Sequence, residues 1–318
     1  MKTRRWLIVL FVVVLLFSMA GNAFARGQQA DARKTIAFVP PAMISPYYQQ
    51  IQRAAQETAD RLGYNLITLA PDSESNFIMQ IQIVEDLITR RVDGILLCAI
   101  DTTAIVSAVR RANEANIPVV MFNVPHELPG GVYVHSYVLY DQREAARMVG
   151  EHVGRTFGHN PVRVGIVLGL PSEHAIEREA GFREGIAPFP NVQVVASAPG
   201  NWEREAGMNA ATAMMTARPD INVLFGQSDE MALGAVQAVI NAGAQGRVTV
   251  VGFDGTPPAV ASVRAGQLHS TVSIGGPETG VLIIETMDRI LRGQSVPRWI
   301  DVATPFVTRE NAHLFDAE

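Results

Sequence analysis

Aromatic and charged side chains occur where the apolar patterns of this sequence break, and their chemistry suits a hydroxylated small molecule. Tyr47, Tyr48 and Trp202 offer aromatic faces that can stack on the C–H faces of a sugar ring. Arg178 and Asp254 can form charge-assisted hydrogen bonds to hydroxyl groups, which are shorter and stronger than neutral ones. A site that pairs with each hydroxyl rejects analogues that lack one, since its own buried groups would then be left unpaired.

The elements that must position these residues are short strands alternating with helices. Apolar, β-rich runs recur roughly every 30 residues, with amphipathic stretches between them. The predicted strands are 35–39, 66–69, 94–99, 118–122, 132–135, 162–168, 192–196, 223–226, 248–253 and 270–273. Such alternation indicates parallel sheets covered on both faces, and 318 residues suit two domains. We therefore expect an α/β fold with two doubly wound parallel-sheet lobes.

The helix that carries the two tyrosines has well-marked ends. Ser45 can cap its N-terminus, and Pro46 suits the first helical position. Gly63 predicts its end, while Tyr48 and Ile51 lie on its apolar face. Two further helices are predicted at 77–88 and 229–242.

In doubly wound sheets, ligands bind beyond the carboxyl ends of the strands. That rule selects the loops 40–45, 122–126, 169–174, 200–203, 226–229 and 253–257. His126 and His174 lie in two of these loops and are therefore the more favoured of the seven histidines for a functional role. Asp229 and Glu230, at the start of a predicted helix, are expected to act as cap and dipole partner rather than as ligand contacts.

Several function classes are disfavoured by composition. The formal net charge of −5 argues against binding to nucleic acid or anionic lipid. No P-loop, dinucleotide fingerprint, nucleophile elbow or zinc-protease motif occurs, and the histidines lack metal-ligand spacing. The single cysteine, Cys98, lies in an apolar run and is expected to be an unreactive buried residue. We therefore expect a binding protein without enzymatic activity, metal or cofactor.

The first 25 residues have the layout of a secretory signal peptide. Lys2, Arg4 and Arg5 precede an apolar run from Trp6 to Met19, and Ala-Phe-Ala at 23–25 forms a small-x-small cleavage site. Cleavage is predicted after Ala25. An uncleaved anchor is the weaker alternative, because a spanning helix needs about 20 apolar residues. The working protein is expected to act outside the cytoplasm, without ATP or NAD.

Five sequence stretches, in order, carry a resemblance to a known family. The most specific are Gln-Ser-Asp-Glu-Met-Ala-Leu-Gly-Ala at 227–235 and Val-Val-Gly-Phe-Asp-Gly-Thr-Pro at 250–257. Supporting stretches lie at 54–64, 115–119 and 178–182. The chain resembles the periplasmic sugar-binding proteins of the ribose-binding type, which are the type I solute receptors of ABC transporters. The resemblance covers nearly all of the chain after the signal peptide.

The resemblance implies two lobes joined by a three-strand hinge, with crossings near 136–140, 273–276 and 300–303. The N-terminal lobe would comprise residues 34–137 plus 275–301, and the C-terminal lobe 138–274 plus 302–318. It also implies a monomeric periplasmic protein that closes about its hinge on a ligand. The protein would then deliver that ligand to the permease of an ABC transporter. The alternative is a periplasmic sensor that presents its ligand to a chemoreceptor or sensor kinase. A repressor core with the same lobes is disfavoured by the signal peptide, and an exported hydrolase by the lack of a nucleophile–base pair.

Carried over residue by residue, the resemblance implies a specific ligand-binding set. Its members are Ser45, Tyr47, Tyr48, Asn123, Arg178, Trp202, Ser228, Asp254 and Ile274. From the residues alone, Tyr48 could instead pack in the core, and Arg178 could instead pair with Glu179 or Glu205 on a helix surface.

This sequence departs from the family pattern at several of these positions. Asn123-Val124 stands where the family has an Asp-Arg pair, Ile274 where it has Gln, and Ser228 where it has Asn. Each lost hydrogen bond to a charged group forfeits about 1.5–3 kcal/mol, whereas micromolar binding amounts to only about 8 kcal/mol. We therefore expect a ligand other than ribose, such as a less hydroxylated sugar, a polyol, a nucleoside or a small signalling furanose.

Overall fold

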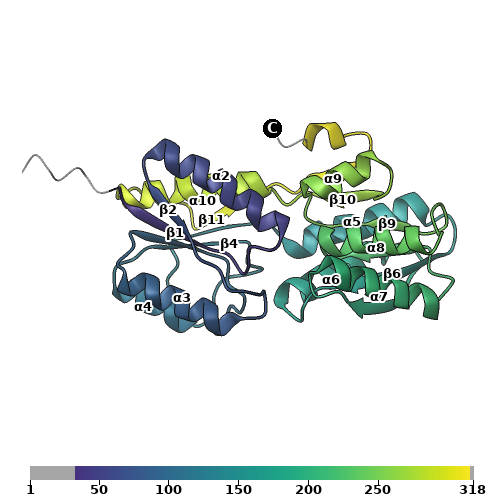
Figure 1. The fold of residues 1–318 in the computed structure, drawn as a ribbon, viewed down its shortest axis with the longest axis horizontal. Helices are drawn as coiled ribbons and strands as arrows, with labels where there is room; N and C mark the ends of the chain where they lie inside the picture. Colours follow the sequence, from purple (N-terminus) through teal and green to yellow (C-terminus); the bar gives the residue numbers. More distant parts are fainter. Residues whose placement is uncertain (1–32, 316–318) are drawn as a thin grey trace, which may run out of the picture. The chain divides into compact units, whose positions relative to one another are not determined.

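The computed structural model describes residues 33–315, so the predicted signal peptide and its cleavage site lie outside the described residues. From Thr35 onward the chain builds two six-stranded sheets, each covered by helices on both faces (Figure 1). The predicted fold class, with two doubly wound parallel-sheet lobes, is confirmed. Within residues 33–315, no helix combines the length and the apolar character needed to span a membrane.

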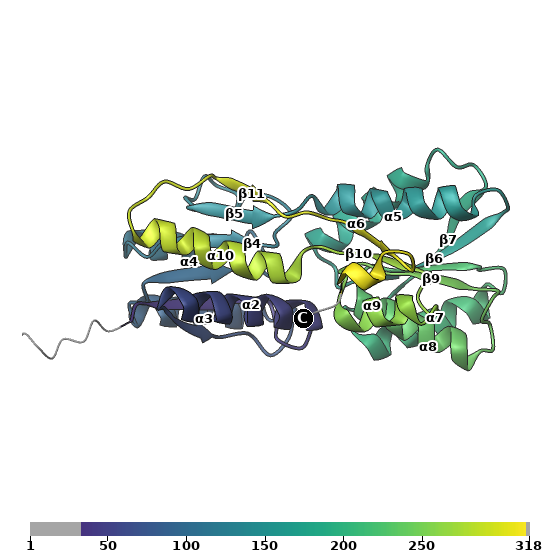
Figure 2. The ribbon, with the colours of Figure 1, turned by 90° about the horizontal axis from the view of Figure 1, so that it is seen from above.

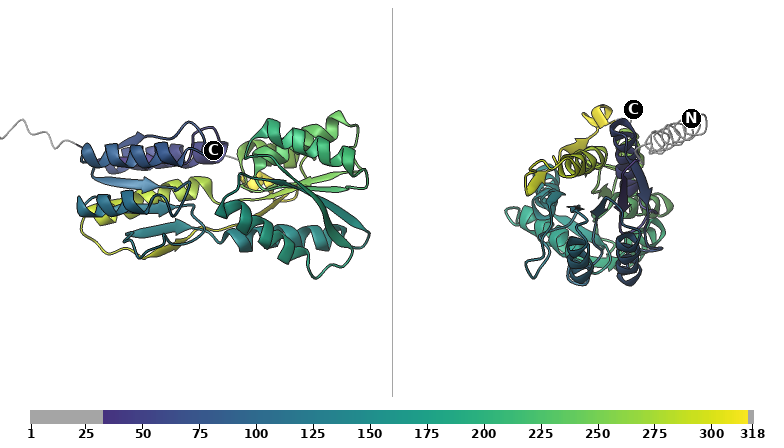
Figure 3. Two further views of the ribbon diagram at one scale, coloured as in Figure 1. Left: turned by 90° about the horizontal axis from the view of Figure 1, so that it is seen from below. Right: turned by 90° about the vertical axis from the view of Figure 1, so that its left-hand side faces the viewer.

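The first lobe is the sheet with strand order β11-β5-β4-β3-β1-β2 and its helices, and all its strand pairs are parallel. Its strands are β1 (Thr35–Val39), β2 (Asn65–Thr68), β3 (Gly94–Leu97), β4 (Val119–Phe122), β5 (Ser136–Leu139) and β11 (Trp299–Asp301). Its helices are α2 (Pro46–Leu62), α3 (Phe77–Thr89), α4 (Val106–Glu114) and α10 (Gly276–Leu291). Helices α2 and α10 lie side by side on one face (Figure 2), and α3 and α4 pack on the other (Figure 3).

The second lobe is the sheet with order β12-β10-β9-β8-β6-β7 and its helices. Its strands are β6 (Val162–Leu168), β7 (Val192–Pro199), β8 (Val223–Gly226), β9 (Thr249–Val251), β10 (Ser270–Val272) and β12 (Phe306–Thr308). Its helices are α5 (Gln142–Phe157), α6 (Glu173–Ile186), α7 (Arg204–Ala217), α8 (Asp229–Asn241) and α9 (Pro257–Arg264), followed by the short 3₁₀ helix η1 (Ala312–Phe315). Only β12 runs antiparallel to its neighbour.

Three segments connect the lobes, after β5, after β10 and after β11. Because α10 and β11 return to the first sheet after the second has formed, each lobe is built from separate parts of the chain. Strand β5 stays in the first sheet through Leu139, which pairs with Asp301. The residue numbers given above for the lobe boundaries remain a prediction.

Helix α2 begins and ends as its local sequence predicts. The Ser45 hydroxyl accepts a hydrogen bond from the Tyr47 N–H at 3.3 Å, and Pro46 is the first helical residue. Gly63 ends the helix with a φ of 82°, a left-handed conformation that glycine adopts without steric cost. These local interactions place both tyrosines in the first turn of the helix.

One predicted strand is wrong. Residues 132–135 form a loop, and the strand of this region is β5, four residues later. Val132 and Val134 are buried, which explains the apolar pattern, but neither residue is part of a strand. Ser136 instead pairs with Val120 of β4, so tertiary pairing rather than local pattern decides where the strand begins. The short strands β11 and β12 were not predicted from the sequence.

Close packing between α5 and α6 holds α6, and with it Arg178, against the second sheet. A Cβ on Gly181 would lie 2.0 Å from the carbonyl oxygen of Arg143, and one on Gly150 would lie 2.3 Å from the carbonyl oxygen of Phe182. Only glycine permits this approach, because any side chain would force the two helices apart.

Candidate ligand-binding site

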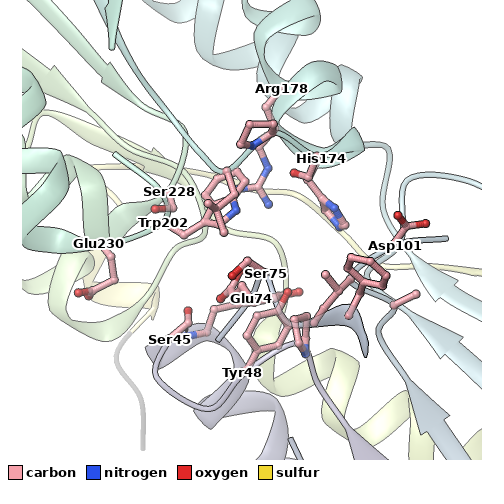
Figure 4. Close-up of a pocket in the computed structure, with 18 of the residues that line it drawn as sticks. Ser45, Tyr48, Glu74, Ser75, Asp101, His174, Arg178, Trp202, Ser228 and Glu230 are labelled. Carbon is pink, nitrogen blue, oxygen red and sulfur yellow. Dashed lines mark hydrogen bonds between the residues drawn. The ribbon is translucent and has the colours of Figure 1, made fainter. Parts of the chain in front are cut away.

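A cavity of about 390 Å³ lies between the two lobes, where loops beyond the carboxyl ends of their strands meet. The first lobe contributes the loops after β1, β2 and β3, and the second those after β6, β7, β8 and β9. Figure 4 shows side chains of both lobes facing one another across it. Seven residues of the predicted ligand-binding set line it: Ser45, Tyr47, Tyr48, Arg178, Trp202, Ser228 and Asp254.

Two tyrosines of α2 form the aromatic wall of the first lobe. The rings of Tyr47 and Tyr48 meet edge to face, with centroids 5.2 Å apart. The Tyr48 hydroxyl accepts a hydrogen bond from the Asn123 amide at 3.1 Å. The Tyr47 hydroxyl is buried and has no hydrogen-bond partner among the described residues. Burial, followed by the charge of neighbouring groups, raises the pKa of both phenols, so both remain protonated donors at neutral pH.

Asn123, one of the predicted ligand contacts, does not line the cavity. It is buried, and its side-chain oxygen accepts a hydrogen bond from the Gln142 amide at 3.2 Å. Its side-chain nitrogen already donates to Tyr48, so the amide links the first lobe to the first residue of α5 in the second lobe. Ile274 is also outside the lining and is fully buried in the core.

Arg178 of α6 is the most heavily bonded side chain at the cavity. Its guanidinium donates to Gln142 Oε1 at 2.9 Å, to the Gln227 carbonyl at 2.6 Å and to the Tyr140 hydroxyl at 2.8 Å. It also donates to Asp254 Oδ1 at 3.3 Å and lies 4.0 Å from the centre of the Phe253 ring. The alternative of a helix-surface charge is therefore wrong. Four of its five N–H groups are engaged, which fixes the guanidinium rigidly and leaves one donor for a ligand.

Asp254 sits in a strained loop that a second buried carboxylate holds in place. The Asp254 φ of 129° is rare for a side-chain-bearing residue. Asp229 accepts hydrogen bonds from the Thr256 N–H and the Thr271 hydroxyl, both at 2.7 Å. Asp229 thus braces the loop that carries Asp254, and Ser228 is the helix cap, accepting from Met231 N–H. Burial raises the pKa of both carboxyls, and Arg178 opposes that rise at Asp254.

Trp202 lies close to Arg178 within the second lobe. The centre of its ring lies 5.4 Å from the guanidinium carbon. A Cβ on Gly169 would lie 2.0 Å from the Trp202 ring, so the indole lies directly against the backbone there. Trp202 has a φ of 67° and Asn123 a φ of 46°. Such conformations in side-chain-bearing residues cluster at functional sites, and both Trp202 and Asp254, which line this cavity, adopt them.

Polar contacts hold the two lobes together at the edge of the cavity. The His174 Nε2 lies 2.8 Å from the carbonyl oxygen of Asn123, so Nε2 must carry the proton it donates. Glu173 accepts a hydrogen bond from the Thr102 hydroxyl at 2.9 Å and lies 3.1 Å from His126 Nε2. Burial and the charge of Arg178 lower the pKa of His174 to about 4, so it is neutral at pH 7. His126 and His174 therefore each form a polar contact between the two lobes.

Metal and thiol chemistry find no support in the described part of the chain. Across residues 33–315, no cluster of three or more histidine, cysteine or acidic side chains could hold a metal ion. Cys98 is buried, and burial raises the pKa of its thiol, which keeps it protonated and unreactive.

Comparison with known proteins identifies the family. A model of the periplasmic binding protein domain matches residues 36–295. The ribose import binding protein RbsB of Escherichia coli K12 is 33% identical over 281 residues, covering 88% of this chain and 93% of that protein. The chain belongs to the periplasmic binding protein family. The D-allose-binding periplasmic protein of the same organism is 28% identical over 294 residues, covering 91% of this chain and 92% of that protein.

Solved structures of other periplasmic binding proteins share the arrangement of lobes. A solute-binding protein of Actinobacillus succinogenes with bound D-allose matches with a TM-score of 0.84 and 28% identity, covering 89% of this chain and all of that one. One from Agrobacterium vitis with bound D-fucose matches with a TM-score of 0.81 and 26% identity, covering 87% and 96%. These relatives are binding proteins of transporters, which agrees with the expectation that the chain is not an enzyme.

Several residues that line the cavity were not predicted from the sequence. Glu74 and Ser75 follow β2, and Asp101 follows β3. Both strands were predicted, and the rule that ligands bind beyond strand ends applied to their loops too. Glu230 also lines the cavity, and Arg204 pairs with it at 2.6 Å.

Proposed function

We propose that this chain is a periplasmic solute-binding protein that encloses one small sugar or sugar-like ligand between its lobes and delivers it to an ABC transporter permease. The single observation that carries the proposal is a cavity built jointly by both lobes, with aromatic faces and rigid charged groups turned into it. The names of relatives add support, since they include proteins for ribose and for D-allose.

The chemistry of the cavity walls favours a hydroxylated ligand. Tyr47 and Trp202 provide ring faces for the C–H groups of a sugar, and the unpartnered Tyr47 hydroxyl provides a donor. Arg178 and Asp254 supply a donor and an acceptor that neighbouring groups already hold in place. Because these groups are ordered before the ligand arrives, their hydrogen bonds cost little conformational entropy on binding.

The size of the cavity favours one sugar ring, and two positions that are polar in the family favour a ligand other than ribose. A volume of about 390 Å³ lies at the lower end of the range of about 300–1,000 Å³ for small-molecule sites. Val124 and Ile274 are fully buried aliphatic residues at positions where sugar-binding proteins of the ribose-binding type have polar ligand contacts. A ligand that needs fewer hydrogen bonds from the first lobe fits this pattern.

We further propose that the ligand is captured by closure about the three connecting segments, with the predicted lobe boundaries at 137/138, 274/275 and 301/302. The contacts of Glu173 and His174 with the first lobe would form on closure and break on opening. A signal peptide cleaved after Ala25 would bring the protein to the periplasm, where it would act as a monomer.

A thermal-shift screen over sugars, polyols and nucleosides tests the proposal. A specific ligand at 100 times its dissociation constant adds about 2.7 kcal/mol of stability, which raises the melting temperature by several degrees. We expect at least one neutral, hydroxylated compound to give this shift and to be recovered unchanged by NMR. The proposal fails if no compound stabilises the protein, or if the ligand is converted to product.

A further inference from the structure

Glu74 lines the cavity from the loop between β2 and α3. Figure 4 shows it on the first-lobe side, across the cavity from Arg178 and Trp202. Among the described residues, no hydrogen bond or ion pair reaches its carboxyl group, although the side chain is partly buried. A desolvated carboxylate without a donor is costly, and such groups in folded proteins usually have a functional reason.

Arg178, on the opposite side of the cavity, does not satisfy Glu74. Arg178 is committed to Asp254 and to three other acceptors on its own side of the cavity. Burial, and then the charge of Asp254, raises the pKa of Glu74 to about 7, while Arg178 opposes that rise. Glu74 therefore lacks the donors that would normally hold a buried carboxylate in its charged form.

Other polar groups of the first lobe at this wall already have a hydrogen-bond partner. The Tyr48 hydroxyl is bonded to Asn123, and the Ser45 hydroxyl accepts from the backbone of α2. The Ser75 hydroxyl lies 3.1 Å from that of Ser73. The carboxyl group of Glu74 and the hydroxyl of Tyr47 remain without partners in the described part of the chain. They form an acceptor and a donor on the same side of the cavity.

We infer that Glu74 is a ligand-binding, specificity-determining residue, whose carboxylate accepts hydrogen bonds from hydroxyl groups of a neutral ligand. The inference rests on the proposed function. In this chain Val124 is aliphatic and Asn123 does not line the cavity, so Glu74 would supply the polar contact from the first lobe. It also sets a charge preference. Among the described lining residues, Asp254 pairs with Arg178 and Glu230 pairs with Arg204, whereas Glu74 and Asp101 are acids without an ion-pair partner. Uronates and sugar phosphates would meet this negative potential and be rejected.

The variants Glu74→Gln and Glu74→Ala test the inference by titration calorimetry with D-ribose, D-allose, D-fucose and D-glucuronate. We expect the alanine variant to bind the preferred neutral sugar about tenfold or more weakly, and the glutamine variant to lie between it and the wild type. Asp72→Asn is the matched control, since Asp72 is an exposed acid of the same loop outside the lining, and it should bind as the wild type does. D-glucuronate should not bind the wild type.

The melting temperatures of the ligand-free variants distinguish a ligand contact at Glu74 from a structural role. Removing a charge that faces Asp254 relieves repulsion, so the ligand-free glutamine variant should melt at or above the temperature of the wild type. Unchanged affinity in both folded variants would overturn the inference and leave the proposed function standing, as would a fall in melting temperature that parallels the loss of affinity. If the wild type binds none of the neutral compounds in the screen, the proposed function fails and the inference with it.

Discussion

Replacing Arg178 with methionine tests whether the buried ion pair with Asp254 organises the second lobe. The side chains of Arg178 and Asp254 are 6% and 8% exposed, so water screens the pair only weakly. Removing one partner of a buried pair typically costs 3–5 kcal/mol, because the other charge is left uncompensated. Asp254 borders the cavity and can gain some hydration there, so we expect a loss near the lower end, about 3 kcal/mol.

The loss should depend on pH in a defined direction. Burial raises the pKa of Asp254, and Arg178 opposes this, so the pKa rises further when Arg178 is removed. The folded variant then binds more protons than the unfolded chain between the ordinary aspartate pKa and the raised one. Its stability falls as pH rises through that window. Relative to the wild type, Arg178→Met should therefore lose less at pH 5, where Asp254 can be protonated, than at pH 8.

Urea unfolding followed by circular dichroism at both pH values measures these differences. The double variant Arg178→Met/Asp254→Asn serves as control, since it removes the orphaned charge as well. It should recover part of the loss at pH 8 and show little difference between the two pH values. A loss in the single variant below about 1 kcal/mol, or one equal at pH 5 and pH 8, would refute the reasoning.

Three further predictions concern helix packing, closure and titration. Gly181→Ala places a methyl group against the Arg143 carbonyl, so unfolding free energy should fall by about 1–3 kcal/mol; an unchanged urea midpoint would contradict the packing argument. Glu173→Ala removes the contact with Thr102, so small-angle scattering of the ligand-free protein should show a larger radius of gyration than for the wild type. His174 has a pKa lowered to about 4, so the unfolded chain binds more protons between pH 6.5 and 4. Stability should fall by on the order of 2 kcal/mol as pH drops through that range, and a His174→Gln variant that loses as much would show that other groups cause it.

Local sequence determines the ends of α2 and the core strands. Ser45, Pro46 and Gly63 act through bonds and steric limits within a few residues, so no knowledge of the fold is needed to place them. Strands β3, β4 and β8 are buried throughout, and a short continuous apolar run carries that information directly. The same patterns, repeated along the chain, were sufficient to predict two parallel-sheet lobes.

The start of β5 and the positions of β11 and β12 depended on tertiary structure. Each forms by pairing with a strand that is distant in sequence, as Trp299 does with Tyr137. Two of the three residues of β11 are exposed, so it lacks an apolar pattern that would mark it as a strand. Edge strands of this kind are defined by their neighbours rather than by their own residues.

The site shows the same division. The family resemblance, carried over residue by residue, predicted seven residues that line one cavity, because strand ends in this fold converge at the same edge. The sequence could not show that the Asn123 amide forms hydrogen bonds with Tyr48 and Gln142. Nor could it show that no donor among the described residues reaches the Glu74 carboxylate. Both outcomes depend on which groups lie within about 3 Å in space, and hydrogen bonding has too short a range for spacing along the chain to reveal them.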